Sequence, residues 1–269
     1  MGFFESIVLG FVQGLTEFLP ISSTGHLILV RSFFAVESGH ALAFDAILHL
    51  ATALAVIVYF KQDIWQLLQA LLRKLSRLPV NKRDETLLYA LLIGTIPAVV
   101  LGLSLESYME STFRSPLLVA AVLVAGSMLF IYAEWKYLSR SANDEVNMSK
   151  GFKIGLFQTL ALLPGMSRSG ATISGGMLLG LSRSEAARFA FLLAVPIILG
   201  AGAKKLLELM SSDISVLWGP VIVGAVTAFL TGLLAIHFML SFVRKHTLWP
   251  FIWYRLVLAG VVVFIFFFN

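Results

Sequence analysis

Long apolar runs separated by short polar segments dominate the pattern of this chain. A helix that crosses a bilayer needs about 20 consecutive, predominantly apolar residues. Six stretches pass this length test, and some of them carry one or two charged residues: 41–60, 87–105, 115–133, 184–203, 214–243 and 249–268. The pattern therefore predicts an all-α polytopic membrane protein with about six transmembrane helices.

Two further apolar stretches, 7–29 and 154–181, are interrupted near their middle. Pro20 and the polar run 22–26 break the first, and the segment 164–170 breaks the second. Each half is too short to cross a bilayer. Broken backbone at membrane depth is tolerated only inside protein or beside a water-filled cavity. We therefore predict two re-entrant hairpins, each made of two half-helices.

The two broken stretches also resemble each other, at an offset of about 145 residues that one single-residue gap adjusts. The matching positions are Gly10 to Gln13 with Gly155 to Gln158, Pro20 with Pro164, Ser22 with Ser167, and Gly25 with Gly170. An alternative is that Gly, Pro and Ser recur in any broken membrane helix. We interpret the match as an internal repeat, approximately 1–115 and 145–269, within a single membrane domain of residues 1–269.

Loop charges orient this repeat. The segment 61–85 contains six basic and three acidic residues, and 136–153 contains four basic and two acidic ones. The positive-inside rule places both in the cytoplasm and the more acidic loop 106–114 outside. Both termini are then periplasmic and the hairpins enter from opposite sides, as in the inverted repeats of many transporters. The amphipathic segment 65–72 is expected on the inner membrane surface.

Composition supports a lipid environment. Of the 269 residues, 58% are hydrophobic and 13% are charged, with a mean hydropathy of +0.90, whereas soluble domains are about 25% charged. The net charge of +5 arises mostly from loop residues without interleaved aromatic side chains, so nucleic acid is not an expected partner. Cysteine is absent, which excludes disulfides and cysteine-based zinc sites. No Lys or Arg precedes Arg31, so we expect the first apolar run to belong to the mature fold rather than to a signal peptide.

Reactive side chains collect at the two breaks. Glu17 is an ionisable group at membrane depth, which indicates function unless it snorkels to the interface or is paired only for structure. Ser23 and His26 share a helix face, and a hydroxyl beside an imidazole can form an activated nucleophile; capping is the alternative. Arg168 offers a planar fork of donors suited to phosphate, or else it only neutralises Glu17.

Hydroxyl groups and helix starts surround these residues. A helix N-terminus and its free N–H groups favour an anion. The expected ligand is therefore a dense anion with an apolar body, for which a lipid pyrophosphate is suitable. Asp45 and His49 are expected to support the site, and Arg255 to anchor its helix near the cytoplasmic end. The predicted substrate-binding residues are Ser22, Thr24, Ser167, Ser169, Gly170 and Thr172.

Two motifs carry a resemblance to a known family. The segments 13–26 (QGLTEFLPISSTGH) and 164–172 (PGMSRSGAT) resemble the undecaprenyl-pyrophosphate phosphatase family, also called the bacitracin-resistance protein BacA. The likeness extends over essentially the whole chain. It implies metal-dependent hydrolysis of undecaprenyl pyrophosphate at the periplasmic side of the bacterial inner membrane. That reaction recycles the carrier lipid for cell-wall synthesis and underlies bacitracin resistance.

The resemblance also implies roles for individual residues. By position, the catalytic group is Glu17, Ser23, His26 and Arg168. Some members have a second Glu where this chain has Gln13, and a neutral amide cannot act as a base, so Gln13 receives no catalytic role.

The resulting hypothesis is that Ser23 attacks the terminal phosphorus while His26 handles its proton. Arg168 would stabilise the phosphate charge, and Glu17 would hold a divalent cation, Mg²⁺ or Ca²⁺, or orient a water. Direct attack by water is an open alternative. A homodimer is the expected assembly. The alternative function is a flippase or transporter of an anionic polyprenyl lipid, because inverted repeats are typical of transporters. A structural scaffold would leave Glu17 and Arg168 unexplained.

Overall fold

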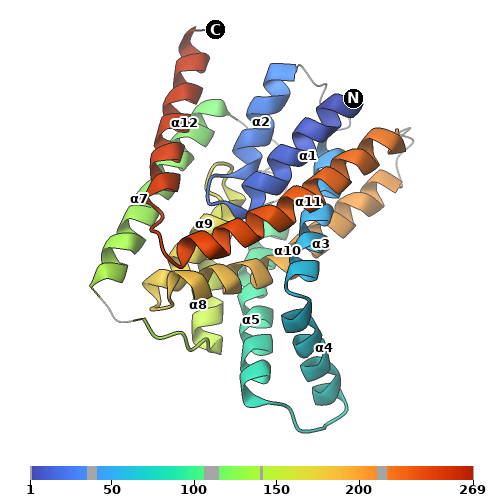
Figure 1. The fold of residues 1–269 in the computed structure, drawn as a ribbon, viewed down its shortest axis with the longest axis vertical. Helices are drawn as coiled ribbons and strands as arrows, with labels where there is room; N and C mark the ends of the chain where they lie inside the picture. The colour runs from blue at the N-terminus through green and yellow to red at the C-terminus, as the bar shows by residue number, and fades with distance from the viewer. Residues whose placement is uncertain (1, 35–40, 106–114, 140–141, 211–216, 269) are drawn as a thin grey trace.

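The computed structural model describes residues 2–34, 41–105, 115–139, 142–210 and 217–268, which form helices and no strand (Figure 1). Within this part of the chain the elements are α1 Phe3–Phe18, α2 Ser23–Phe34, α3 Ala41–Tyr59, α4 Lys61–Leu75, α5 Lys82–Ser104, α7 Pro116–Leu138, α8 Met148–Thr159, the 3₁₀ turn η2 Leu160–Leu162, α9 Arg168–Leu178, α10 Arg183–Met210, α11 Trp218–Val243 and α12 Trp249–Phe268. The predicted outer loop 106–114 and residues 214–216 lie outside these ranges.

The predicted number of spans is confirmed when α3 and α4 are counted together. Five described helices, α5, α7, α10, α11 and α12, are long and apolar enough to cross a membrane, and the pair α3–α4 raises the number to six. The axis turns by 85° between α3 and α4, at Phe60. The amphipathic segment 65–72 falls inside α4. Its position on the inner membrane surface stays a prediction.

The two predicted breaks are present as helix–break–helix pairs. Residues 19–22 separate α1 from α2, and residues 163–167 separate η2 from α9. Ser22 and Ser167, which the repeat alignment pairs, both adopt the left-handed conformation, with φ of 75° and 69°. Each serine also caps the helix that follows, because its Oγ accepts from the backbone N–H three residues later at 3.3 and 3.2 Å. The two breaks therefore share backbone geometry as well as sequence, and the longer internal repeat stays a prediction.

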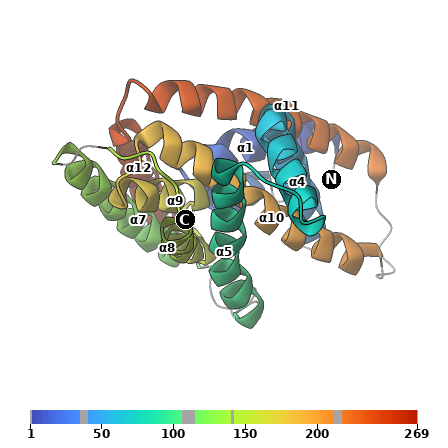
Figure 2. The same cartoon turned by 90° about the horizontal axis from the view of Figure 1, so that it is seen from below.

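Each broken pair packs against a helix from the other half of the chain. Helix α1 lies along α11 and α8 lies along α5 (Figures 1 and 2). Glycines allow these close approaches: a Cβ on Gly10 would lie 2.3 Å from the carbonyl oxygen of Gly224, and one on Gly155 would lie 2.1 Å from that of Gly94. Because each broken pair packs against the other half of the chain, the two breaks come into contact at the centre. There Ser169 Oγ donates to the Leu19 carbonyl at 3.2 Å.

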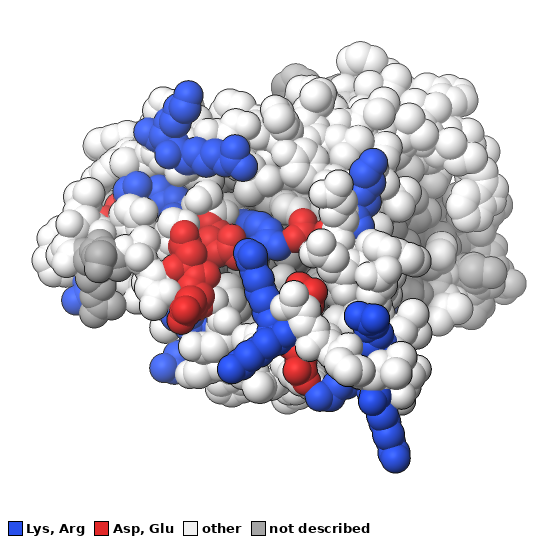
Figure 3. Space-filling model, turned by 60° about the horizontal axis from the view of Figure 1, so that its bottom comes forward, with Lys and Arg blue, Asp and Glu red and all other residues white. Residues whose placement is uncertain are grey.

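Charge is distributed unevenly over the surface. The start of α1 and the end of α12 lie at one end of the molecule, opposite the connection between α4 and α5 (Figure 1). Figure 3 views the molecule obliquely from that opposite end, where basic and acidic side chains gather while much of the flank is uncharged. Large apolar side chains such as Leu103, Leu234 and Phe264 are exposed on the flanks. This distribution is the one expected of a membrane protein.

Candidate active site

A pocket of about 380 Å³ lies between the two breaks and the helices α3, α5 and α10. One wall is polar and includes Glu17, Ser23, His49, Gln158 and Arg168. The lining residues from α5, η2 and α10 form a mostly apolar wall, with Ala98, Ala161, Leu162, Ile197, Ile198 and Ala201, and Lys205 of α10 is its charged member. A pocket that combines a polar wall with a mostly apolar wall suits a ligand with a charged head and an apolar body.

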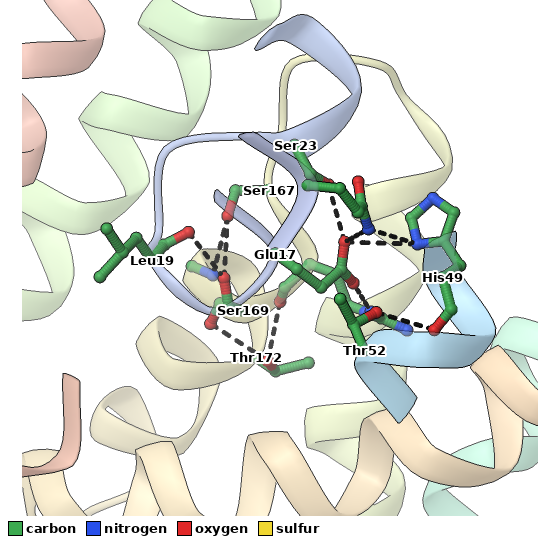
Figure 4. Close-up of polar contacts among 11 residues, drawn as sticks. Glu17, Leu19, Ser23, His49, Thr52, Ser167, Ser169 and Thr172 are labelled. Carbon is green, nitrogen blue, oxygen red and sulfur yellow. Dashed lines mark hydrogen bonds and ion pairs between the residues drawn. The ribbon is translucent and has the colours of Figure 1, made fainter. Parts of the chain in front are cut away.

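Glu17 is at the centre of the polar wall. Its side chain is only 4% exposed, and its two oxygens have different partners. Oε1 forms an ion pair with Arg168 Nη2. Oε2 accepts from Ser23 Oγ at 2.8 Å and from Gln13 Nε2 at 2.9 Å, and lies 3.4 Å from His49 Nδ1 (Figure 4). A single carboxylate thus links both breaks to α1 and α3.

Ser23 and Arg168 occupy equivalent places in the repeat. They are the first residues of α2 and α9, directly after Ser22 and Ser167. The left-handed conformation of the preceding serine turns the chain sharply into the helix, and unusual backbone conformations of this kind cluster at functional sites. From these positions Ser23 and Arg168 both reach Glu17. The first turns of both helices also leave backbone N–H groups without intrahelical partners.

The structure does not bring His26 to Ser23. His26 Nδ1 lies 2.7 Å from the Ser22 carbonyl oxygen, which can only accept, so Nδ1 carries a proton. Its Nε2 lies 2.6 Å from the hydroxyl of Tyr254, and the two rings stack with their centroids 5.6 Å apart. Both ring nitrogens are therefore engaged away from Ser23, and His26 is not among the residues that line the pocket. The hydrogen-bond partner of the Ser23 hydroxyl is the Glu17 carboxylate.

The six predicted substrate-binding residues divide into two groups. Ser22, Thr24 and Ser167 line the pocket. The others lie behind it: the hydroxyl of Thr172 donates to the Arg168 carbonyl at 2.7 Å, and Ser169 donates to Leu19. A Cβ on Gly170 would lie 2.0 Å from the ring of Phe130. We therefore assign Ser169, Gly170 and Thr172 to the packing of the break rather than to ligand contact.

Gln13 contributes more than the sequence indicated. Gln13, which received no catalytic role, is fully buried and holds both Glu17 Oε2 and His49 Nδ1 at 2.9 Å with one amide nitrogen. The spacing of four between Gln13 and Glu17 on one helix was the available signal. His49 supports Glu17 as expected. Asp45 lines the pocket and forms a two-pronged ion pair with Arg31.

The expectation that Arg255 anchors its helix near the membrane surface is wrong. Arg255 is completely buried, lies over the ring of Phe130 and donates to Ser127 Oγ at 3.2 Å. Its remaining guanidinium hydrogens reach the carbonyls of Gly165 at 3.0 Å and Met166 at 3.2 Å, which belong to the second break. A buried cation needs such partners, and here the partners are the segment that leads into Arg168. Arg255 therefore positions the second break.

Replacing Arg255 with Lys is expected to lower turnover by about tenfold to a hundredfold with a smaller change in KM, because small displacements of catalytic groups are costly. Arg255 donates to four oxygens, those of Ser127, Leu123, Gly165 and Met166, and the three N–H groups of one ammonium cannot satisfy all of them. The measurement is kcat and KM per folded enzyme, with Arg244→Lys on the exposed surface as the control. A lower melting temperature with unchanged kcat would instead assign Arg255 to stability alone.

The described residues do not fit a divalent cation held by the protein alone. They contain no group of three or more acidic or histidine side chains that could bind a metal. The carboxylate of Glu17 is already engaged by Arg168, Ser23 and Gln13. A hard cation needs about six oxygen ligands. Most of them would therefore have to come from the phosphates of a substrate and from water.

The fold and the site together define a polytopic membrane protein with a pocket that places Glu17, Ser23 and Arg168 beside a mostly apolar wall. The sequence model of the family described as "Bacitracin resistance protein BacA" matches residues 6–261, and the chain belongs to this family. Similar curated proteins carry the name undecaprenyl-diphosphatase. The one from Marinobacter nauticus is 40% identical, over 97% of this chain and 98% of the relative. Those from Rubrobacter xylanophilus (40%, over 96% of each chain) and Idiomarina loihiensis (38%, over 99% of this chain and 100% of the relative) are similar over the same extent.

Proposed function

We propose that the chain is an undecaprenyl-diphosphatase, which hydrolyses undecaprenyl pyrophosphate to undecaprenyl phosphate and inorganic phosphate. The observation that carries the proposal is the group Glu17, Ser23 and Arg168 in a pocket that also has a mostly apolar wall. Full-length similarity to proteins with this name supports the substrate. The product is the lipid carrier that cell-wall synthesis reuses.

The contacts support a serine nucleophile. Ser23 already donates its hydroxyl proton toward Glu17 Oε2 at 2.8 Å. In the proposed first step the bond from Ser23 Oγ to the terminal phosphorus forms, the bond from phosphorus to the bridging oxygen breaks, and the proton passes to Glu17. Undecaprenyl phosphate leaves with the bridging oxygen. Water then attacks the phosphorus of the phosphoserine, the bond from phosphorus to Ser23 Oγ breaks, and Glu17 returns its proton to that oxygen. Inorganic phosphate leaves with the oxygen and protons of the water, and both Glu17 and the serine hydroxyl are restored.

Glu17 replaces His26 as the proton acceptor in this proposal. The ring of His26 is held between Ser22 and Tyr254, whereas Glu17 touches the hydroxyl directly. His26 keeps a positioning role, because its contact to the Ser22 carbonyl holds the turn that precedes Ser23.

Arg168 and the two helix starts would stabilise the transferring phosphate. In phosphoryl transfer most of the catalytic effect comes from positioning and from compensating charge on the phosphate oxygens. Arg168 lines the pocket, and only its Nη2 contacts Glu17, which leaves the rest of the guanidinium for phosphate. A divalent cation, Mg²⁺ or Ca²⁺, stays a prediction, and no step of the mechanism depends on it.

Release of inorganic phosphate by the purified protein tests the function. We expect undecaprenyl pyrophosphate to give one phosphate per molecule of undecaprenyl phosphate formed. A transporter of an anionic lipid would also need Arg168, but it would need no nucleophile beside a carboxylate. Binding of the lipid without phosphate release would contradict the proposed function and favour the transporter.

Replacing Ser23 with Ala is expected to lower kcat by about a thousandfold, and Ser22→Ala by less than about tenfold. The Ser23 hydroxyl contacts Glu17 in the pocket, whereas the Ser22 hydroxyl caps Gly25 N–H. Steady-state phosphate release measures both variants. Trapping of a phosphorylated wild-type protein in a rapid quench would add direct support. Mild and equal losses in the two variants would indicate attack by water.

Sidedness also belongs to the proposal. The chain is a membrane protein of a bacterial family. The basic segments 61–85 and 136–153 favour placing the α4–α5 end in the cytoplasm. The pocket would then open toward the periplasm from the inner membrane, where undecaprenyl pyrophosphate is released. A homodimer stays a prediction.

Because the chain has no cysteine, single cysteines can report on sidedness. In intact cells, Glu208→Cys is expected to react with a membrane-impermeant thiol reagent. Arg77→Cys is expected to react only after the inner membrane is opened. Both positions are exposed in the structure. The opposite labelling pattern would invert the topology and place the pocket opening in the cytoplasm.

A further inference from the structure

Gln158 is a buried amide without a hydrogen-bond partner. It lies near the end of α8, is 2% exposed, and lines the pocket. Neither its Nε2 nor its Oε1 has a partner within the described part of the chain. Burying such a group unpaired costs free energy because its hydrogen bonds to water are lost, and unpaired buried groups are rare in native proteins. An amide kept at this cost indicates that a ligand completes its contacts.

The internal repeat strengthens this interpretation. Gln158 is the counterpart of Gln13, and the nitrogen of Gln13 is satisfied by Glu17 and His49. The two glutamines follow Gly155 and Gly10, which seat their helices against the opposite half of the chain. Gln13 therefore donates to the carboxylate of Glu17. Gln158 lines the pocket that contains this carboxylate, but its N–H donors and its carbonyl acceptor have no partner among the described residues.

The position of Gln158 indicates which part of a ligand it contacts. Gln158 lies two residues before the turn η2, whose Ala161 and Leu162 belong to the mostly apolar wall. Helix α8 packs along α5, which contributes Ala98 to the same wall. Gln158 therefore stands where the polar wall meets the mostly apolar wall. In a lipid diphosphate, the group at the corresponding boundary is the phosphate esterified to the tail.

We propose that Gln158 is a substrate-binding residue whose amide N–H groups donate to the tail-linked phosphate of the lipid diphosphate. The inference rests on the proposed function for the identity of the substrate. Glu17, Ser23 and Arg168 then hold the terminal phosphate, which leaves as inorganic phosphate. The tail-linked phosphate is retained in the product, so Gln158 contacts substrate and product alike. Such a contact changes the binding of substrate and product, and because negative charge grows on this phosphate as it leaves, it also contributes to the chemical step.

The experiment compares Gln158→Leu and Gln158→Glu with the wild-type protein. It measures kcat and KM for undecaprenyl pyrophosphate, and it measures binding of undecaprenyl phosphate directly by equilibrium titration. We expect Gln158→Leu to raise KM and the dissociation constant of the product by about tenfold, the effect of losing one hydrogen bond to a charged group, with a smaller fall in kcat. Gln158→Glu is expected to raise both further, because its carboxylate repels phosphate.

Ser174→Ala is the matched control. Ser174 is another buried polar residue whose hydroxyl has no partner among the described residues, but it does not line the pocket. We expect this variant to change the melting temperature only. Gln158→Leu is expected to melt at the wild-type temperature or above it, because it removes two unpaired buried atoms. If it fails to fold, Gln158→Glu, which is nearly identical in shape, decides the matter.

Two outcomes would overturn the inference. KM and product affinity that stay at wild-type values in the Gln158 variants would show that water satisfies the amide. A fall in kcat without a change in product affinity would make Gln158 part of the chemical step or of the scaffold. Failure of the proposed function is recognised separately, because a wild-type protein that releases no phosphate can still be titrated with undecaprenyl phosphate.

Discussion

Replacing Glu17 with Gln is expected to lower kcat by about a thousandfold, the middle of the range for losing a general base. The amide keeps the shape of the side chain and can still contact Ser23, but it cannot accept the proton of the serine hydroxyl. It also removes the charge that holds Arg168 at the pocket. The measurement is phosphate release at saturating undecaprenyl pyrophosphate and saturating Mg²⁺.

A second buried carboxylate provides the control for Glu17. Glu134 is 2% exposed, pairs with Arg183 and accepts from the Leu248 N–H at 2.7 Å, but it does not line the pocket. Glu134→Gln is expected to lower the melting temperature, because it breaks a buried ion pair, and to leave kcat per folded molecule unchanged. If Glu17→Gln keeps more than about a tenth of the wild-type kcat, Glu17 is not the proton acceptor.

Arg168→Lys is expected to lower kcat/KM by about a hundredfold while the protein still inserts and folds. A lysine keeps the positive charge, but it lacks the planar fork that binds two phosphate oxygens at once. In other phosphoryl-transfer enzymes a single arginine contributes about 10³ to 10⁵ in rate, and retention of the charge preserves part of that effect. Phosphate release over a range of substrate concentrations measures the loss.

Arg183→Lys, at the ion pair with Glu134 outside the pocket, is the matched control for Arg168. It removes the same fork from a buried pair and is expected to affect stability only. Near-wild-type turnover of Arg168→Lys would contradict a two-pronged contact with phosphate and would reduce Arg168 to a counter-ion of Glu17.

The two breaks have the same backbone arrangement but hold different side chains. Ser22 and Ser167 share a left-handed turn and the same capping contact, but the residues that follow them are Ser23 and Arg168. A nucleophile therefore stands at one helix start and a cation at the other. The equal geometry of the breaks aims both residues at the same carboxylate of Glu17.

Much of the fold could be predicted because its determinants are local. The length of an apolar run decides whether a helix can cross a bilayer. A proline accompanied by a run of polar residues interrupts the helix at 20–26 and 164–170, whereas the lone Pro97 and Pro196 lie inside the continuous helices α5 and α10. The same local rules identified Glu17 and Arg168, because an ionisable group inside an apolar run costs free energy at membrane depth and therefore indicates a functional role. The sequence by itself therefore determined the helices, the breaks and the main charged residues of the site.

Only the tertiary structure decided which of these groups meet. Helical spacing placed Ser23 and His26 on one face, but Tyr254, more than 200 residues away, engages the His26 ring, and Glu17 becomes the partner of Ser23. The same holds for Arg255, whose partners come from α7 and from the second break. Sequence spacing reports neighbours within one helix, whereas a polar group buried among several helices takes whichever donor or acceptor the packing brings within about 3 Å.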